Sequence, residues 1–173
     1  MSSMPTEREG LPPCMIFIDK EGRWFHEGVE MIHRDFIQLF YQNMELDSGG
    51  EYVINWDGRR CYVEVEDTAF VVRRVAYEEE GPSQAPRFLL YLSDDTREDL
   101  LPETLFIGKD NVLYCRVKEQ AFPARFNRAA YYQLAEHIVE ENGVYYLPCH
   151  GKKYDLSLPT VVTPGSLQST AGE

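Results

Sequence analysis

The sequence predicts an α+β fold made of two tandem, diverged ββαββ-like units, with mainly antiparallel strands and an intervening β-hairpin. Three observations predict it: short β-rich runs bounded by turn residues, one helical stripe in each half of the chain, and the same order of these elements in both halves. Hydrophobic residues make up 43% of the 173 residues, which is enough to bury a core without disulfides, metal or an obligate partner.

The predicted division of the chain has five parts. Loop composition at both ends predicts flexible tails at 1–13 and 159–173. Between the tails we expect the first repeat unit at 14–67, a connecting hairpin and short helix at 68–104, and the second repeat unit at 105–158.

Each unit opens with two strands joined by a turn. Residues 15–26 contain both strands of the first copy, with Gly22 in the turn, and residues 105–115 contain those of the second copy, with Asn111. Glycine and asparagine tolerate a positive φ best, so Gly22 and Asn111 are expected to serve the same turn.

A helix is expected next in each unit. Apolar residues recur at helical spacing over 35–44 and again over 127–141. Asn127 is a good N-cap for the second helix. Small and glycine-containing segments at 48–50 and 142–143 are expected to end the two helices.

Each unit is expected to close with a β-hairpin. An Asp-Gly turn lies within 52–65 and a His-Gly turn lies within 145–156, and both pairs of residues suit a two-residue hairpin loop. A basic doublet follows each turn, at 59–60 (Arg-Arg) and at 152–153 (Lys-Lys). The shared spacing, turn and doublet are the strongest sign of a repeat.

The segment between the copies predicts further structure. Two β-rich runs at 68–77 and 87–92 predict a hairpin with an exposed tip at 78–82. Residues 94–101 begin with Asp-Asp-Thr and are expected to form a short, capped helix.

Charge and cysteine content indicate where the chain works. The formal net charge of −12 argues against binding to nucleic acid or to a membrane surface. Cys14, Cys61, Cys115 and Cys149 lie far apart, and the chain shows neither a secretory leader nor a long apolar run. We therefore expect reduced thiols and a cytoplasmic location.

Motifs that carry chemistry are sparse. Cys149 and His150 are adjacent, but neighbouring side chains of a strand point to opposite faces, so a packed cysteine beside a turn histidine is the favoured interpretation. The closely spaced cysteines and histidines of metal sites are missing, as are the glycine-rich phosphate loops and the nucleophile elbow. We expect no cofactor and no metal.

Several segments resemble a known family. They are 22–28 (Gly-Arg-Trp-Phe-His-Glu-Gly), 34–35 (Arg-Asp), 39–40 (Leu-Phe), 65–71 (Val-Glu-Asp-Thr-Ala-Phe-Val) and 125–132 (Arg-Phe-Asn-Arg-Ala-Ala-Tyr-Tyr). In these the chain resembles the bacterial family catalogued as domain of unknown function 1285. The resemblance implies an α+β fold with a repeated motif and a loosely suggested signalling role, and it implies no catalytic residues. The segment 145–151 departs from the Gly-rich aromatic close expected of that family.

The favoured hypothesis is a non-enzymatic binding or regulatory module. It would hold a small anionic ligand or a protein partner's segment between its two repeats. The sequence shows a repeat but no catalytic signature, so binding at the junction of the two copies is favoured over catalysis. The candidate site residues are Arg59 and Arg60 as anion contacts, Trp24 as an aromatic wall, and His26 and Arg34 as polar anchors.

Other interpretations stay open. Ordinary solvation of a hairpin also explains the basic doublets, and core packing is favoured for Trp24 and Trp56. A small enzyme with a thiol or hydrolytic site would use Cys149. An assembly subunit would present exposed strand edges. The oligomeric state is left open.

Overall fold

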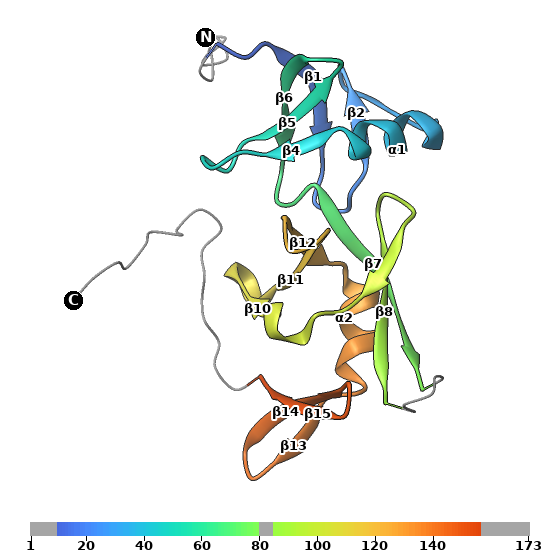
Figure 1. Ribbon diagram of the computed structural model, residues 1–173, viewed down its shortest axis with the longest axis vertical. Helices are drawn as coiled ribbons and strands as arrows, with labels where there is room; N and C mark the ends of the chain where they lie inside the picture. Colours follow the sequence, from blue (N-terminus) through green and yellow to red (C-terminus); the bar gives the residue numbers. More distant parts are fainter. Residues whose placement is uncertain (1–9, 80–84, 157–173) are drawn as a thin grey trace, which may run out of the picture.

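The computed structural model describes residues 10–79 and 85–156. The tail predicted at 159–173 lies outside the described residues, as do most of the tail at 1–13 and residues 80–82 of the hairpin tip. Three β-sheets, called A, B and C here, follow one another along the long axis of the molecule (Figure 1).

Sheet A forms the first unit. Its strands are β1 (Pro13–Ile18), β2 (Trp24–His26), β3 (Val29–Glu30), β4 (Met44–Leu46), β5 (Tyr52–Trp56) and β6 (Arg59–Val65). They lie in the order β3-β2-β1-β6-β5-β4, in which the central neighbours β1 and β6 are parallel and all others are antiparallel. Helix α1 (Arg34–Gln42) connects β3 to β4 and packs Ile37 and Tyr41 into the core.

Sheet B repeats this topology. Its strands are β7 (Phe70–Glu78), β8 (Arg87–Leu92), β9 (Arg97–Asp99), β10 (Phe106–Ile107), β11 (Leu113–Val117) and β12 (Phe122–Phe126). They lie in the order β10-β11-β12-β7-β8-β9, and again the first and last strands of the unit are parallel neighbours at the centre. The 3-10 helices η1 (Pro102–Thr104) and η2 (Lys109–Asn111) flank β10. The prediction of two tandem α+β units with mainly antiparallel strands is confirmed.

The strands that correspond in the two sheets are not those that the sequence comparison aligned. By position, β7 corresponds to β1 and β12 to β6, so the repeat of the fold spans 13–65 and 70–126. The hairpin β7–β8, expected to connect the units, belongs to sheet B. The alignment was based on turn residues, and it was wrong because the same residues, Gly, Asn and Asp-Gly, suit every hairpin of that turn type, whichever two strands the hairpin joins.

A smaller subassembly follows sheet B. Helix α2 (Arg128–Ala135) leads to the three-stranded sheet C, with strands β13 (Val139–Glu141), β14 (Val144–Cys149) and β15 (Lys152–Asp155). The predicted N-cap is confirmed, because the Asn127 side-chain oxygen accepts a hydrogen bond from the Ala130 amide at 2.8 Å. The expected hairpin at 145–156 is also confirmed, but it lies in sheet C.

Both predicted helix ends are wrong. Helix α1 ends at Gln42 and is followed by β4, so the glycines at 49–50 lie in the β4–β5 turn. Helix α2 ends at Ala135, and Asn142 and Gly143, with φ of 54° and 79°, form the β13–β14 turn. An Asn-Gly pair closes a two-residue hairpin as readily as it ends a helix, which explains the error.

The short helix predicted at 94–101 is also wrong. Asp95 takes a positive φ of 65° in the turn after β8, and the chain then returns as strand β9. Asp94 stabilises this turn by accepting a hydrogen bond from the Thr96 amide at 3.1 Å. The same residue type that caps a helix therefore closes a hairpin here.

The turn positions themselves are predicted well. Gly22 and Asn111 have positive φ values of 78° and 58°. Asp57 and Gly58 both have positive φ, as the expected type of hairpin turn requires, and so do the His-Gly residues before β15.

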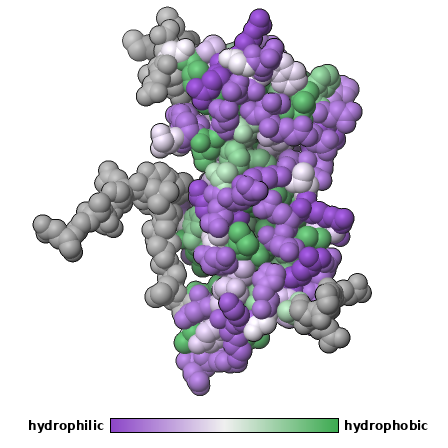
Figure 2. Space-filling view, in the orientation of Figure 1, coloured by the Kyte–Doolittle hydropathy of each residue, from purple (hydrophilic) through white to green (hydrophobic). Residues whose placement is uncertain are grey.

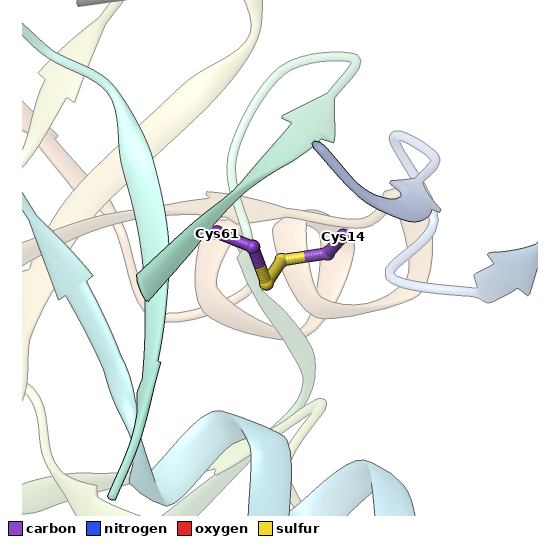
Figure 3. The surroundings of a disulfide bond; sticks show 2 residues. All are labelled: Cys14 and Cys61. Carbon is purple, nitrogen blue, oxygen red and sulfur yellow. A yellow bond between two sulfur atoms is a disulfide. The ribbon is translucent and has the colours of Figure 1, made fainter. Parts of the chain in front are cut away.

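Cys14 and Cys61 form a disulfide that links β1 to β6 (Figure 3). The expectation of reduced thiols is therefore wrong for this pair. The two residues are 47 positions apart in the chain, but the parallel pairing of their strands brings their Cα atoms to 5.0 Å. Cys115 and Cys149 are free and buried.

The surface drawn in Figure 2 is mainly hydrophilic, with hydrophobic residues exposed in small groups. Within the described part of the chain, no helix has the length and apolar character needed to cross a bilayer.

Candidate functional site

The junction between sheets A and B, where the sequence predicted a site, is filled by packed side chains. The ring of Tyr41 from α1 lies 4.8 Å from the ring of Phe70 at the start of β7. Its hydroxyl donates to the Ala69 carbonyl at 2.7 Å and shares a second hydrogen bond, of 2.9 Å, with the Ser93 hydroxyl. Burial raises the pKa of Tyr41, so the hydroxyl stays protonated and keeps its role as a donor.

Aromatic rings continue this contact across the two sheets. Tyr52 of β5 stacks on Phe122 of β12 with ring centroids 6.4 Å apart, and Phe122 lies 4.8 Å from Phe70. Burial also raises the pKa of Tyr52 to about 12. A cleft between the units would expose these rings, whereas all three are buried.

Arg34 belongs to this junction. Its guanidinium forms an ion pair of 2.8 Å with Asp95 and donates to the Ser93 carbonyl at 2.8 Å. Gln38, one helical turn further along α1, donates to the same Asp95 carboxylate at 3.0 Å. The predicted polar anchor therefore connects α1 of the first unit to the β8–β9 turn of the second.

The basic doublets lie at opposite ends of the molecule. Arg59 and Arg60 begin β6, which runs toward the junction and continues into β7, so the doublet is at the end of sheet A farthest from sheet B (Figure 1). Lys152 and Lys153 lie on β15 in sheet C. Arg60 forms an ion pair of 3.3 Å with Glu45. The structure does not bring the doublets together.

The two tryptophans differ. Trp24 is 1% exposed and stacks on Phe40, with ring centroids 6.1 Å apart, which confirms core packing. Trp56 is 45% exposed, so core packing is wrong for this residue. It ends β5 beside the turn, where it pairs with Arg59 in register and meets Phe40 only edge-on. His26 is exposed at the end of β2.

A cavity of about 410 Å³ opens over β1 and β6 on the face of sheet A that points away from α1. Its walls are mainly apolar and come from β1, β2, β6 and the β2–β3 turn: Pro13, Met15, Ile16, Phe17, Phe25, Glu27, Gly28, Tyr62 and Glu64. On β1, Ile16 and Ile18 belong to the core, so Phe17 between them projects to the opposite face.

An irregularity in β1 shapes this cavity. Pro13 pairs with Tyr62 and Phe17 pairs with Glu64, so residues 14–16 of β1 lie opposite a single residue of β6. Met15 takes a positive φ of 62°, and its carbonyl accepts a hydrogen bond of 3.0 Å from the Glu27 amide. The Cys14–Cys61 disulfide covalently holds this bulged segment against β6.

A second cavity of about 430 Å³ adjoins the first and shares Phe17 and Glu64 with it. It extends along the same sheet to the segment between the two units, and its lining consists of Phe17, Gly50, Glu51, Tyr52, Val63, Glu64, Val65 and Asp67. We call the two cavities together the sheet A groove. Phe17, which is 39% exposed, stands where they meet.

The sheet A groove is acidic. No lysine, arginine or histidine is among the described residues that line it. The side chains of Glu27 and Glu64 are exposed and form no ion pair or hydrogen bond with another described residue. Asp67 differs, because it pairs with Arg125 at 2.9 Å and accepts from the Tyr114 hydroxyl at 2.7 Å.

Sequence reasoning missed Phe17 and Glu64. Apolar residues at both odd and even positions of 15–18 are a signal that both faces of that strand contact apolar surroundings. Glu64 between Val63 and Val65 marks the solvent side of β6. What the sequence does not show is the parallel pairing that sets Phe17 opposite Glu64.

The free cysteines lack the surroundings of a reactive thiol. Burial raises the pKa of both Cys115 and Cys149. Cys149 is buried in β14, whereas His150 is exposed in the turn that follows. In residues 10–79 and 85–156, no cluster of three or more histidine, cysteine or acidic side chains is arranged to hold a metal ion.

Two crystal structures share the fold. A DUF1285 family protein from Silicibacter pomeroyi DSS-3 superposes with a TM-score of 0.68 and 16% identity, over 90% of this chain and 88% of that protein. A DUF1285 family protein from Shewanella baltica OS155 gives a TM-score of 0.57 and 20% identity, over 70% of this chain and 91% of that protein. The resemblance expected from the sequence is thus confirmed at the level of the fold. No family model and no curated protein matches the chain.

Because the thiol of Cys149 is buried, we predict that thiol reagents modify it slowly. Because its pKa is raised, the thiolate fraction near pH 8 is smaller than that of an ordinary cysteine. An aromatic disulfide reagent should modify it at least about tenfold more slowly in the folded Cys115→Ala variant than in the same variant in urea. Modification at the rate of a model peptide would restore the thiol-enzyme interpretation.

Proposed function

We propose that this chain, which has the fold of DUF1285 family proteins, is a non-enzymatic binding module whose site is the sheet A groove. One observation carries the proposal: a cavity with mainly apolar walls adjoins a second, more polar cavity, and Phe17 and Glu64 of sheet A line both. On monomeric proteins, contiguous exposed apolar surface of this kind usually marks a binding site.

The proposed site lies beside the junction of the units. The second cavity reaches Asp67, and Asp67 is bound to Arg125 and Tyr114 of sheet B, so an occupant would touch the segment that joins the two units. This modifies the prediction of a site between the repeats, because the space directly between the sheets is filled by Tyr41, Phe70 and their neighbours.

The prediction that an anionic ligand binds Arg59 and Arg60 concerns a separate place, the start of β6 at the end of sheet A away from sheet B. Arg60 is engaged with Glu45, so Arg59 would be the main contact. His26 precedes Glu27 of the groove in the chain, and Trp24 is buried in the core and lines neither cavity.

The other classes of function have less support. A thiol enzyme needs an accessible thiolate, and both free cysteines are buried. An assembly subunit that pairs through strand edges needs long edges, whereas the outer strands of the three sheets have between two and four residues. A regulatory, signalling-related role fits a module that holds a partner, and the family resemblance is what suggests it.

A cytoplasmic location is part of the proposal, and the disulfide allows a direct test of it. The Cys14–Cys61 disulfide counts against this location, because cellular thiols keep most cytoplasmic cysteines reduced, and a cytoplasmic chain would have to carry the pair as thiols for most of its lifetime. Acid-quenched cells, denatured and treated with a maleimide of known mass, should then yield chains with all four cysteines labelled. Labelling of only Cys115 and Cys149 would indicate an oxidising compartment.

A thermal-shift screen of metabolites and short peptides tests the binding function. A ligand at about 100 times its dissociation constant stabilises the folded state by about 2.7 kcal/mol, which raises the Tm by several degrees. The shift should disappear in the Phe17→Ser variant, which loses the ring between the two cavities.

The matched control is Phe36→Ser, since Phe36 is 57% exposed on α1 and lines neither cavity. This variant should keep the full shift. Compounds that stabilise Phe17→Ser as much as the wild type would place the site elsewhere.

A further inference from the structure

We propose that the occupant of the sheet A groove is a basic, apolar segment of a partner protein, which sets a lysine or arginine side chain against Glu27 and Glu64 and an apolar side chain against Phe17. This inference rests on the proposed binding function and adds to it the chemical class of the partner. Three features of the groove carry it: its walls, its charge and its division into two adjoining cavities.

The walls favour an apolar partner. Met15 and Phe17 are both more than one-third exposed, and they lie next to Phe25 and Tyr62 in the first cavity. Large apolar side chains that gather in this way lose contact with water when a partner covers them, which is the main driving force of association. An entirely hydrophilic ligand would leave this driving force unused.

The charge of the groove favours a cation. Glu27 and Glu64 have no ion-pair partner among the described residues, and no basic side chain lines the groove. The net charge of −12 adds to the local negative potential, which attracts cations and repels anions. Lysine and arginine meet both demands at once, because they carry an apolar stem and a charged end.

The shape of the groove favours an extended segment over a compact metabolite. Two cavities of about 410 and 430 Å³ lie side by side, separated by Phe17 and Glu64. Alternate side chains of an extended segment point the same way and lie about 7 Å apart, so neighbouring residues of that series can enter neighbouring cavities. The groove crosses the middle of sheet A, over the central strands β1 and β6, so recognition would depend on side chains and not on an added strand.

Three capped hexapeptides test the proposal by isothermal titration calorimetry with the full chain. They carry lysine and leucine, glutamate and leucine, or lysine and serine at alternate positions, with serine at the positions between, so that both side chains of each pair point toward the groove. We expect the Lys-Leu peptide to bind, and the other two to bind at least about tenfold more weakly, because each lacks one of the two required features. Raising the salt concentration should weaken the Lys-Leu complex further.

The decisive variant is the double substitution Glu27→Gln and Glu64→Gln. Glutamine keeps the size of both side chains, which lie on the surface, so the fold should be retained and the Tm should confirm it. Loss of both ion pairs should weaken Lys-Leu binding on the order of tenfold. Glu136→Gln with Glu140→Gln is the matched control, since both residues are exposed, lie outside the groove and change the net charge equally. This control should bind as the wild type does.

Several results would overturn the proposal. Unchanged binding of Lys-Leu to the Glu27→Gln, Glu64→Gln variant would remove the two carboxylates from the site. Equal binding of Glu-Leu would remove the charge preference, and equal binding of Lys-Ser would remove the apolar half. If none of the peptides binds but the thermal-shift screen finds a compound that needs Phe17, the partner class is wrong and the binding function stands. If neither experiment finds binding, both proposals fail.

Discussion

The hydroxyl of Tyr41 stands between the two units and bonds to both the Ala69 carbonyl and the Ser93 hydroxyl. A hydroxyl has one proton, and that of Tyr41 goes to Ala69, so Ser93 donates to the Tyr41 oxygen while it accepts from the Val71 amide at 2.9 Å. Every member of this buried network is thus satisfied, and such networks are costly to open because each lost bond would leave a buried polar group unpaired. Helix α1 is therefore held against sheet B, and the space between the units is closed.

This constraint decides which surface of the first unit is left for binding. Helix α1 is committed to the core face of sheet A and to the junction, where Arg34 reaches Asp95. The opposite face of the sheet carries Phe17 and Glu64, and the bulge in β1 hollows it beside the disulfide. The packing that closes the space between the units therefore leaves the sheet A groove as the candidate binding surface.

Much of the fold was predictable from the sequence, because local turn chemistry is strong. Asp57 and Gly58 marked the β5–β6 hairpin, and Asn127 marked the start of α2. The pairing of strands far apart in the chain was not predictable. Strands β1 and β6 are the first and last of their unit, so no local turn signal shows that they are neighbours, and the Cys14–Cys61 disulfide depends on that pairing. The candidate site was missed for the same reason. Chemically distinctive residues such as Arg34 and Trp24 proved to serve the junction and the core, whereas the groove consists of ordinary strand and turn residues.

The closed junction is tested most directly at Gly22. A Cβ atom at this position would lie 3.0 Å from the Ser93 Cβ atom and 3.2 Å from Val71 of the second unit, whereas a Cβ atom at Gly28, which has a similar φ of 83°, would meet nothing within 4 Å. Both alanine variants carry the cost of a positive φ, about 1 kcal/mol, so urea unfolding of the two isolates the contact between the units. A closed junction predicts that Gly22→Ala loses at least about 1 kcal/mol more of the free energy of unfolding than Gly28→Ala does. Equal losses would show that the units are not tightly packed, and the space between them would again be the first place to look for a ligand.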